Sequence, residues 1–200
     1  RLCSSAASDV YKRQASGCYE KNDSGVTNFG REAIKEMNRL GIVVDMSHSG
    51  EKSTLDAIDL SQKPIAITHA TPSFWHHNKR SKSEDLLKTL AKSGGMLGLS
   101  IYPHHLKDGT HCTLDSFCEM IARLTDIMGI KNIGIGSDLC LNQPDNVVEW
   151  MRNGTWTKTK NLGEGSKNNQ GFPEQPTWFK DARGFKNIEI GLQKIGFNDS

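Results

Sequence analysis

The stretch GREAIKEMNRLGIVVDMSHSG, residues 30–50, carries the pattern that decides the fold. Its first half has the periodicity of an amphipathic helix and ends at Gly41, a residue type that commonly stops helices. The apolar run from Ile42 to Met46 predicts a buried strand, and polar residues including His48 follow it. The order of helix, buried strand and polar loop is typical of a parallel α/β fold.

The same alternation continues along the chain. Further helices are predicted near residues 51–61, 83–92, 113–129 and 187–195, and further buried strands at 65–68, 94–102 and 132–137. Residues 153–184, rich in Gly, Asn, Lys and Pro, predict a long surface loop. Strands that alternate with helices imply parallel βα units, so the fold class is α/β.

The two ends of the chain do not fit this pattern. Residues 1–14, RLCSSAASDVYKRQ, show no periodicity and are interpreted as a non-native or assembly-derived leader. Residues 15–200 then form one partial domain. The closing GFNDS resembles the cap of a helix whose body is absent, so we expect a chain that is truncated at both ends.

Charge and composition argue for a small substrate. Lys and Arg total 25 against 23 Asp and Glu, and a net charge of +2 gives no electrostatic case for nucleic acid or an anionic membrane. No apolar run approaches the roughly 18–20 residues of a membrane helix. No secretion signal is visible, and both cytoplasm and periplasm stay open. The five Cys residues lack CxxC spacing, which argues against a zinc knuckle.

Polar residues recur where the predicted strands end: His48, His69, Tyr102 and Asp138. The carboxyl ends of parallel strands meet at one edge of a sheet, so these residues can converge although they are far apart in sequence. Two His and an Asp suit metal-assisted hydrolysis. Each His could instead be a hydrogen-bonded structural residue, and Tyr102 could simply pack. Asp45 could orient His48 or bridge inside the fold.

The motif of residues 30–50, followed by PIAITHATPSFW (64–75) and GIGSD (134–138), resembles in order and spacing the central and late motifs of the renal (membrane) dipeptidase family. The likeness spans roughly residues 17–140. It implies the carboxy-terminal portion of a (β/α)8 TIM-like barrel and zinc-dependent hydrolysis of dipeptides. A homodimer is compatible with the resemblance.

The resemblance also implies roles for four residues. His48 and His69 match two histidine ligands of one zinc in a centre of two zinc ions. Arg80 matches the arginine that binds the terminal carboxylate of the substrate, and a guanidinium can bind a carboxylate through two hydrogen bonds. Asp138 matches the acidic residue that handles the proton during attack and release, and its carboxylate suits general acid–base work.

Some features depart from the family pattern. Leu139-Cys140-Leu141 follow Asp138 where the family commonly has Phe-Asp-Gly, and Ser81 follows Arg80 where Asn is frequent. The family's His-x-Asp motif, its metal-bridging Glu and a further His belong to strands upstream of this sequence. We therefore expect the 200-residue chain alone to be inactive.

Two alternatives stay open from the residues. An amidohydrolase-like enzyme that acts on a lactam or another cyclic amide would share the metal chemistry without needing Arg80. A member of the family that binds a metal or a partner without turnover would lack the upstream ligands.

Overall fold

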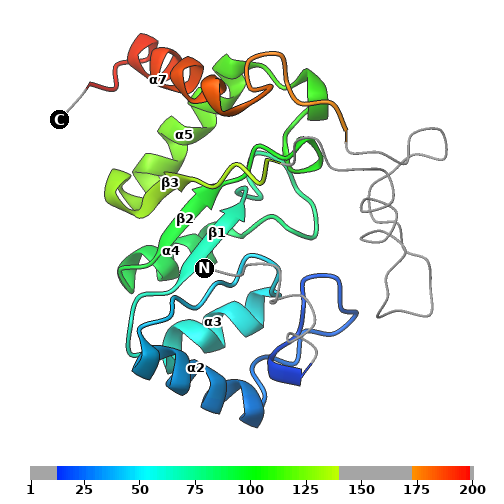
Figure 1. Ribbon diagram of the computed structural model, residues 1–200, viewed down its shortest axis with the longest axis vertical. Coiled ribbons are helices and arrows are strands. Elements are labelled where there is room, and N and C mark those ends of the chain that lie inside the picture. Colours follow the sequence, from blue (N-terminus) through cyan, green and yellow to red (C-terminus); the bar gives the residue numbers. More distant parts are fainter. Residues whose placement is uncertain (1–12, 140–172, 199–200) are drawn as a thin grey trace. The chain divides into compact units, whose positions relative to one another are not determined.

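The computed structural model describes residues 13–139 and 173–198 (Figure 1). Its backbone divides into two compact units, one of residues 1–100 with 121–137 and the other of residues 101–120 with 138–200. The predicted leader falls mostly on residues 1–12, which lie outside the described part. The predicted loop of residues 153–184 lies outside it up to residue 172.

The first unit contains a parallel three-stranded sheet with the order β1-β2-β3 (Figure 1). The strands are β1 (Ala66–Ala70), β2 (Met96–Leu99) and β3 (Ile133–Ile135). Ala66 pairs with Met96 and Ala70 with Leu99, so β1 holds one residue more than β2 over this span. This bulge lies at Thr68 and His69, and a bulge changes the direction in which nearby side chains point.

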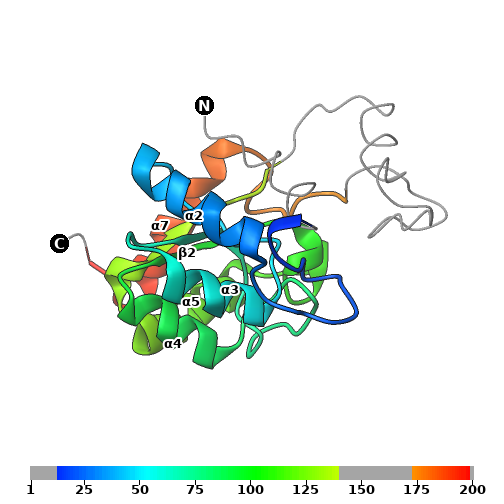
Figure 2. The ribbon, with the colours of Figure 1, turned by 90° about the horizontal axis from the view of Figure 1, so that it is seen from below.

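Among the described residues, the α-helices that lie wholly within the first unit are α2 (Asn28–Leu40), α3 (Glu51–Leu60) and α4 (Glu84–Lys92). The hydroxyls of Thr27 and Ser83 cap α2 and α4, and Gly41 ends α2 with φ 71°. α3 contacts both α2 and α4, and α3 and α4 lie side by side in both views (Figures 1 and 2).

The core of the first unit comes from one face of each element. Leu86, Leu87 and Leu90 of α4 are fully buried, as are Ile67 of β1 and Leu97 of β2. Burial of a Leu or Ile side chain stabilises the fold by about 1.5–3 kcal/mol each. This core fixes the strands, and the strands fix the residues at their carboxyl ends.

The second unit packs around aromatic side chains. It contains the start of α5 (Leu114–Met128), η5 (Ala182–Gly184) and α7 (Phe185–Lys194). Phe117 and Phe179 are fully buried, and Trp178 Nε1 donates a hydrogen bond of 2.7 Å to the Cys112 carbonyl. Trp178 therefore packs within this unit, with its ring centre 5.2 Å from that of Phe117.

The prediction of a fully buried strand at residues 42–46 is wrong. Ile42 and Val43 are 46% and 47% exposed, and only Asp45 makes a bridge, to Ala66 of β1. Val44 and Met46 are buried because the extended segment turns alternate side chains inward. Within the described residues, the backbone of this segment forms hydrogen bonds with β1, from Met46 N to the Ala66 carbonyl and from Ala66 N to the Val44 carbonyl.

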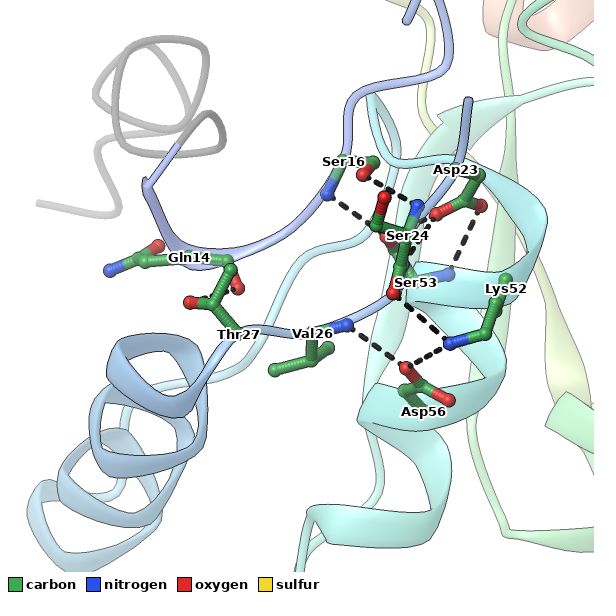
Figure 3. A network of polar contacts seen from close by, with 10 residues as sticks. Gln14, Ser16, Asp23, Ser24, Val26, Thr27, Lys52, Ser53 and Asp56 are labelled. Carbon is green, nitrogen blue, oxygen red and sulfur yellow. Dashed lines mark hydrogen bonds and ion pairs between the residues drawn. The ribbon is translucent and has the colours of Figure 1, made fainter. Parts of the chain in front are cut away.

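Two boundaries also differ from the prediction. β1 continues to Ala70, so His69 lies within the strand rather than after it. Gln14, assigned to the leader, accepts a 2.8 Å hydrogen bond from Thr27 N and so belongs to the folded part (Figure 3). No helix among the described residues is long and apolar enough to cross a membrane.

Candidate metal and substrate site

Two histidines meet at the carboxyl end of β1. His48 Nε2 lies 3.0 Å from His69 Nε2, and both side chains are half-buried. A tetrahedral zinc with Zn–N bonds of about 2.0–2.1 Å would separate two ligand nitrogens by roughly 3.3 Å. A small rotation of either ring supplies the difference, so this pair fits two positions of one zinc ion.

Thr68 determines which nitrogen of His69 carries the proton. Its Oγ1 donates to Asp45 Oδ2 at 2.7 Å, because a carboxylate only accepts, and Oγ1 lies 2.9 Å from His69 Nδ1. The hydroxyl has one proton, so it accepts from Nδ1–H. His69 then turns the lone pair of Nε2 toward His48 Nε2, as a metal ligand requires.

Asp45 is the centre of this network and is linked to His69 through the Thr68 hydroxyl. The carboxylate also accepts from the backbone and hydroxyl of Ser47, at 3.0 and 2.5 Å, and from Thr68 N at 3.1 Å. Burial raises the pKa of Asp45, but these hydrogen bonds outweigh it and hold the pKa below its ordinary value. A stable carboxylate keeps the Thr68 hydroxyl oriented.

The Thr68 carbonyl is held against two glycines. A Cβ at Gly98 or at Gly136 would overlap the Thr68 carbonyl oxygen, so the neighbouring strands approach β1 here only because both residues lack a side chain. The bulge that directs His69 is therefore supported from β2 and from the residue after β3.

The charge environment keeps His48 neutral. Burial first, then the positive charge of Arg80, the neighbouring His69 and the positive charge of Lys82, lower the pKa of His48 to about 3, against the opposing effect of Asp45. A neutral imidazole keeps a lone pair for a metal.

Arg80 lies beside the histidine pair and is only 5% exposed. Its Nη2 donates to the His69 carbonyl at 3.3 Å, and its Nε is buried without a hydrogen-bond partner among the described residues. A buried N–H group without a partner costs about 1–3 kcal/mol, which a carboxylate ligand would recover.

The other predicted residues are placed as follows. Asp138 follows the end of β3 by three residues, with φ 54°, and belongs to the second unit. Tyr102 also belongs to the second unit, where its ring contacts those of His104 and His105. Within residues 13–139 and 173–198, no three His, Cys, Asp or Glu side chains form a group able to hold a metal.

Comparison with known proteins identifies the family. Residues 2–150 match the family model of membrane dipeptidases, peptidase family M19. The chain belongs to the membrane dipeptidase family. This is a family of metallopeptidases that hydrolyse peptide bonds, and the resemblance drawn from the motifs is confirmed.

Individual relatives agree with the assignment to the membrane dipeptidases. An uncharacterised dipeptidase of Schizosaccharomyces pombe is 31% identical over 118 residues, which cover 58% of this chain and 28% of that protein. Dipeptidase 3 of Mus musculus is 28% identical over 115 residues, covering 58% of this chain and 23% of that protein. The chain thus spans about a quarter of the length of these relatives.

Solved structures share the fold. An amidohydrolase from Pseudomonas aeruginosa superposes with a TM-score of 0.80 and 33% identity, over 92% of this chain and 55% of that chain. A metallo peptidase from Rhodobacter sphaeroides, liganded with a phosphinate mimic of L-Ala-D-Ala, superposes with a TM-score of 0.67 and 22% identity, over 88% and 42% of the two chains. The α/β class of parallel strands and helices is thereby confirmed.

Sequence reasoning assigned no role to Thr68 or Lys82. Thr68 lies in the quoted motif directly before His69, and Lys82 follows Arg80 by two residues. A hydroxyl directly before a candidate ligand was the available signal for Thr68. Nothing in the sequence marks a lysine as buried.

Proposed function

We propose that the whole protein is a zinc-dependent dipeptidase and that this chain supplies one side of its active site. The observation that carries the proposal is the placement of a buried, incompletely bonded Arg80 beside the facing Nε2 atoms of His48 and His69. Family membership supports dipeptide hydrolysis as the reaction class.

His48 and His69 would hold one zinc ion of a two-zinc centre. Both present a nitrogen at the same point, and the Thr68 contact leaves the Nε2 lone pair of His69 available. The remaining ligands would come from the rest of the barrel, whose carboxy-terminal portion we propose this chain to be. Bound zinc would polarise the scissile carbonyl and lower the pKa of a coordinated water.

Arg80 would bind the free carboxylate of a dipeptide. Its Nη2 donates to the carbonyl of His69, a proposed metal ligand, so the position of the guanidinium is fixed relative to that ligand. The substrate carboxylate and the metal would therefore be held at a fixed separation. A guanidinium donates two parallel hydrogen bonds to a carboxylate, which selects substrates with a free C-terminus.

Asp138 would take up the proton released during attack and return it to the departing amine. A carboxylate suits this role because it is ionised at neutral pH and can accept a proton reversibly.

An amidohydrolase that acts on cyclic amides is a second candidate. The name of the 33% identical Pseudomonas aeruginosa protein favours an amidohydrolase and specifies no substrate. The two candidates differ in their use of Arg80, because a cyclic amide offers no free carboxylate to it.

Comparing an alanyl dipeptide with its C-terminal amide, in a zinc-loaded protein that carries the rest of the family domain, tests the proposal. We expect kcat/KM for the free acid to exceed that for the amide by about a hundredfold or more, the penalty of an unpaired buried charge. Arg80→Met should remove this difference by lowering only the free-acid value. Equal rates on both substrates in the unaltered protein would favour the amidohydrolase.

A further inference from the structure

Lys82 is a buried lysine for which the proposed reaction has no role. It is 2% exposed, and its Nζ donates to the Ser49 carbonyl at 2.8 Å and to the Met46 carbonyl at 3.3 Å. Burial of an ammonium group is costly unless its hydrogen bonds are satisfied. The pKa of Lys82 falls to about 8, chiefly through this burial.

The two carbonyls stand on either side of His48 in the sequence. Ser49 N also donates to the Met46 carbonyl at 3.2 Å, so residues 46–49 form a turn. Lys82 bonds both ends of this turn, and an ammonium group with three N–H donors can do so. The His48 side chain projects from the middle of the turn.

A strap of residues 16–18 holds the other side of the same turn. Cys18 N donates to the His48 carbonyl at 2.8 Å, and Gly50 N donates to the Ser16 carbonyl at 3.0 Å. Figure 3 shows the strap anchored on α3: Ser16 N donates to Ser53 Oγ, and Asp23 accepts from both the hydroxyl and the backbone N–H of Ser53.

The backbone of Lys82 is joined to the segment that follows β1. Lys82 N donates to the Thr71 carbonyl at 3.0 Å, and Ser73 N donates to the Lys82 carbonyl at 2.8 Å. Thr71 follows His69 by two residues, and Arg80 precedes Lys82 by two. Lys82 therefore connects the turn of His48 to the segment of His69 and Arg80.

We infer that Lys82 is a positioning residue, whose buried ammonium group fixes the His48 turn against the His69 strand so that both imidazoles reach one metal ion. The inference deepens the proposed function and rests on it. It makes Lys82 a determinant of metal affinity although Lys82 contacts neither the metal nor the substrate.

The test compares zinc affinity, by chelator competition, in Lys82→Met and in Lys79→Met within a protein that carries the rest of the family domain. Met keeps the apolar stem and removes the donors. Lys79 is exposed on the same segment, with its Nζ 5.8 Å from the centre of the Tyr19 ring. We expect Lys82→Met to weaken zinc binding about 10–100-fold, the range for partners that orient metal ligands, and Lys79→Met to leave it unchanged.

Two further readouts separate positioning from general stability. The melting temperature of metal-free Lys82→Met should be equal to or above that of the unaltered protein, because a buried charge is removed. The visible spectrum of the cobalt-substituted protein should change, because it reports the geometry of the ligands. If Lys82→Met does not fold, Lys82→Gln, which keeps one amide donor group, should show intermediate affinity.

Failure of the inference and failure of the proposed function give different results. Unaltered zinc affinity and an unaltered cobalt spectrum in a folded Lys82 variant overturn the inference, provided that His48→Ala loses zinc. Retention of full zinc affinity by His48→Ala overturns the proposed function instead.

Discussion

Replacement of Thr68 by Val tests the hydrogen-bond relay that orients His69. Val has the shape of Thr without the hydroxyl, so His69 Nδ1 loses the oxygen at 2.9 Å and Asp45 Oδ2 loses the donor at 2.7 Å. The imidazole is then free to place its proton on Nε2, where the proposed metal requires a lone pair.

The expected magnitude follows from these two contacts. Partners that orient a metal-bound His contribute about 10–100-fold to metal affinity, or about 1.4–2.8 kcal/mol. Loss of the hydrogen bonds to the Asp45 carboxylate and to His69 should lower the free energy of unfolding by about 1–3 kcal/mol. Chelator competition measures the first quantity and urea denaturation of the metal-free protein measures the second.

Thr54→Val is the matched control for this substitution. Thr54 is fully buried, and its hydroxyl donates to the Gly50 carbonyl at 2.8 Å. It should lower stability by a similar amount and leave zinc affinity unchanged. Equal zinc affinities in the two variants would refute the role assigned to Thr68.

Three further predictions concern other parts of the chain. Asp138→Asn should keep the metal and lose about two to four orders of magnitude in kcat, whereas Asp108→Asn, at an exposed residue with φ 64°, should not; near-normal kcat for the first would contradict the proton role. The pKa of Lys82 is lowered from 10.5 to about 8 on folding, so between pH 8 and pH 10.5 the folded protein binds fewer protons than the unfolded chain. The charged Lys82 therefore destabilises the folded protein fully below pH 8, and this effect disappears toward pH 10.5. The free energy of unfolding of the metal-free protein should therefore rise by up to roughly 3 kcal/mol across that window relative to Lys82→Met, and parallel curves would contradict this. Asp23→Ala should destabilise the protein by about 1–2 kcal/mol, since it caps α3, whereas Asp59→Ala, exposed on the same helix, should not; equal melting temperatures would show that the cap contributes nothing.

Local signals in the sequence predicted the helices of the first unit and the positions of β1, β2 and β3. The side chains of Thr27 and Ser83 accept hydrogen bonds from free backbone N–H groups in the first turns of α2 and α4, and Gly41 ends α2 with a left-handed backbone conformation. The period of the apolar residues also predicted that parallel strands bring His48 and His69 to one edge. These inferences depend on neighbours within a few residues, which a sequence displays directly.

Contacts between distant residues were not predictable in this way. α3 begins at Glu51 as predicted, but nothing local to the helix shows that Asp23, 30 positions away, accepts a hydrogen bond from Ser53 N in its first turn. The burial of Lys82 depends on the fold of the Met46–Ser49 turn, and the bulge at Thr68 depends on the close approach of Gly98. The same kind of long-range contact links Asp45 to His69 through the Thr68 hydroxyl.

The metal content of His69→Ala most directly tests the central claim, that His48 and His69 share a zinc ion. In a protein that carries the rest of the family domain, elemental analysis should show two zinc ions per chain before the substitution and one fewer after it. His77→Ala, at an exposed histidine on the following segment, should keep both. Retention of both zinc ions by a folded His69→Ala would contradict the account.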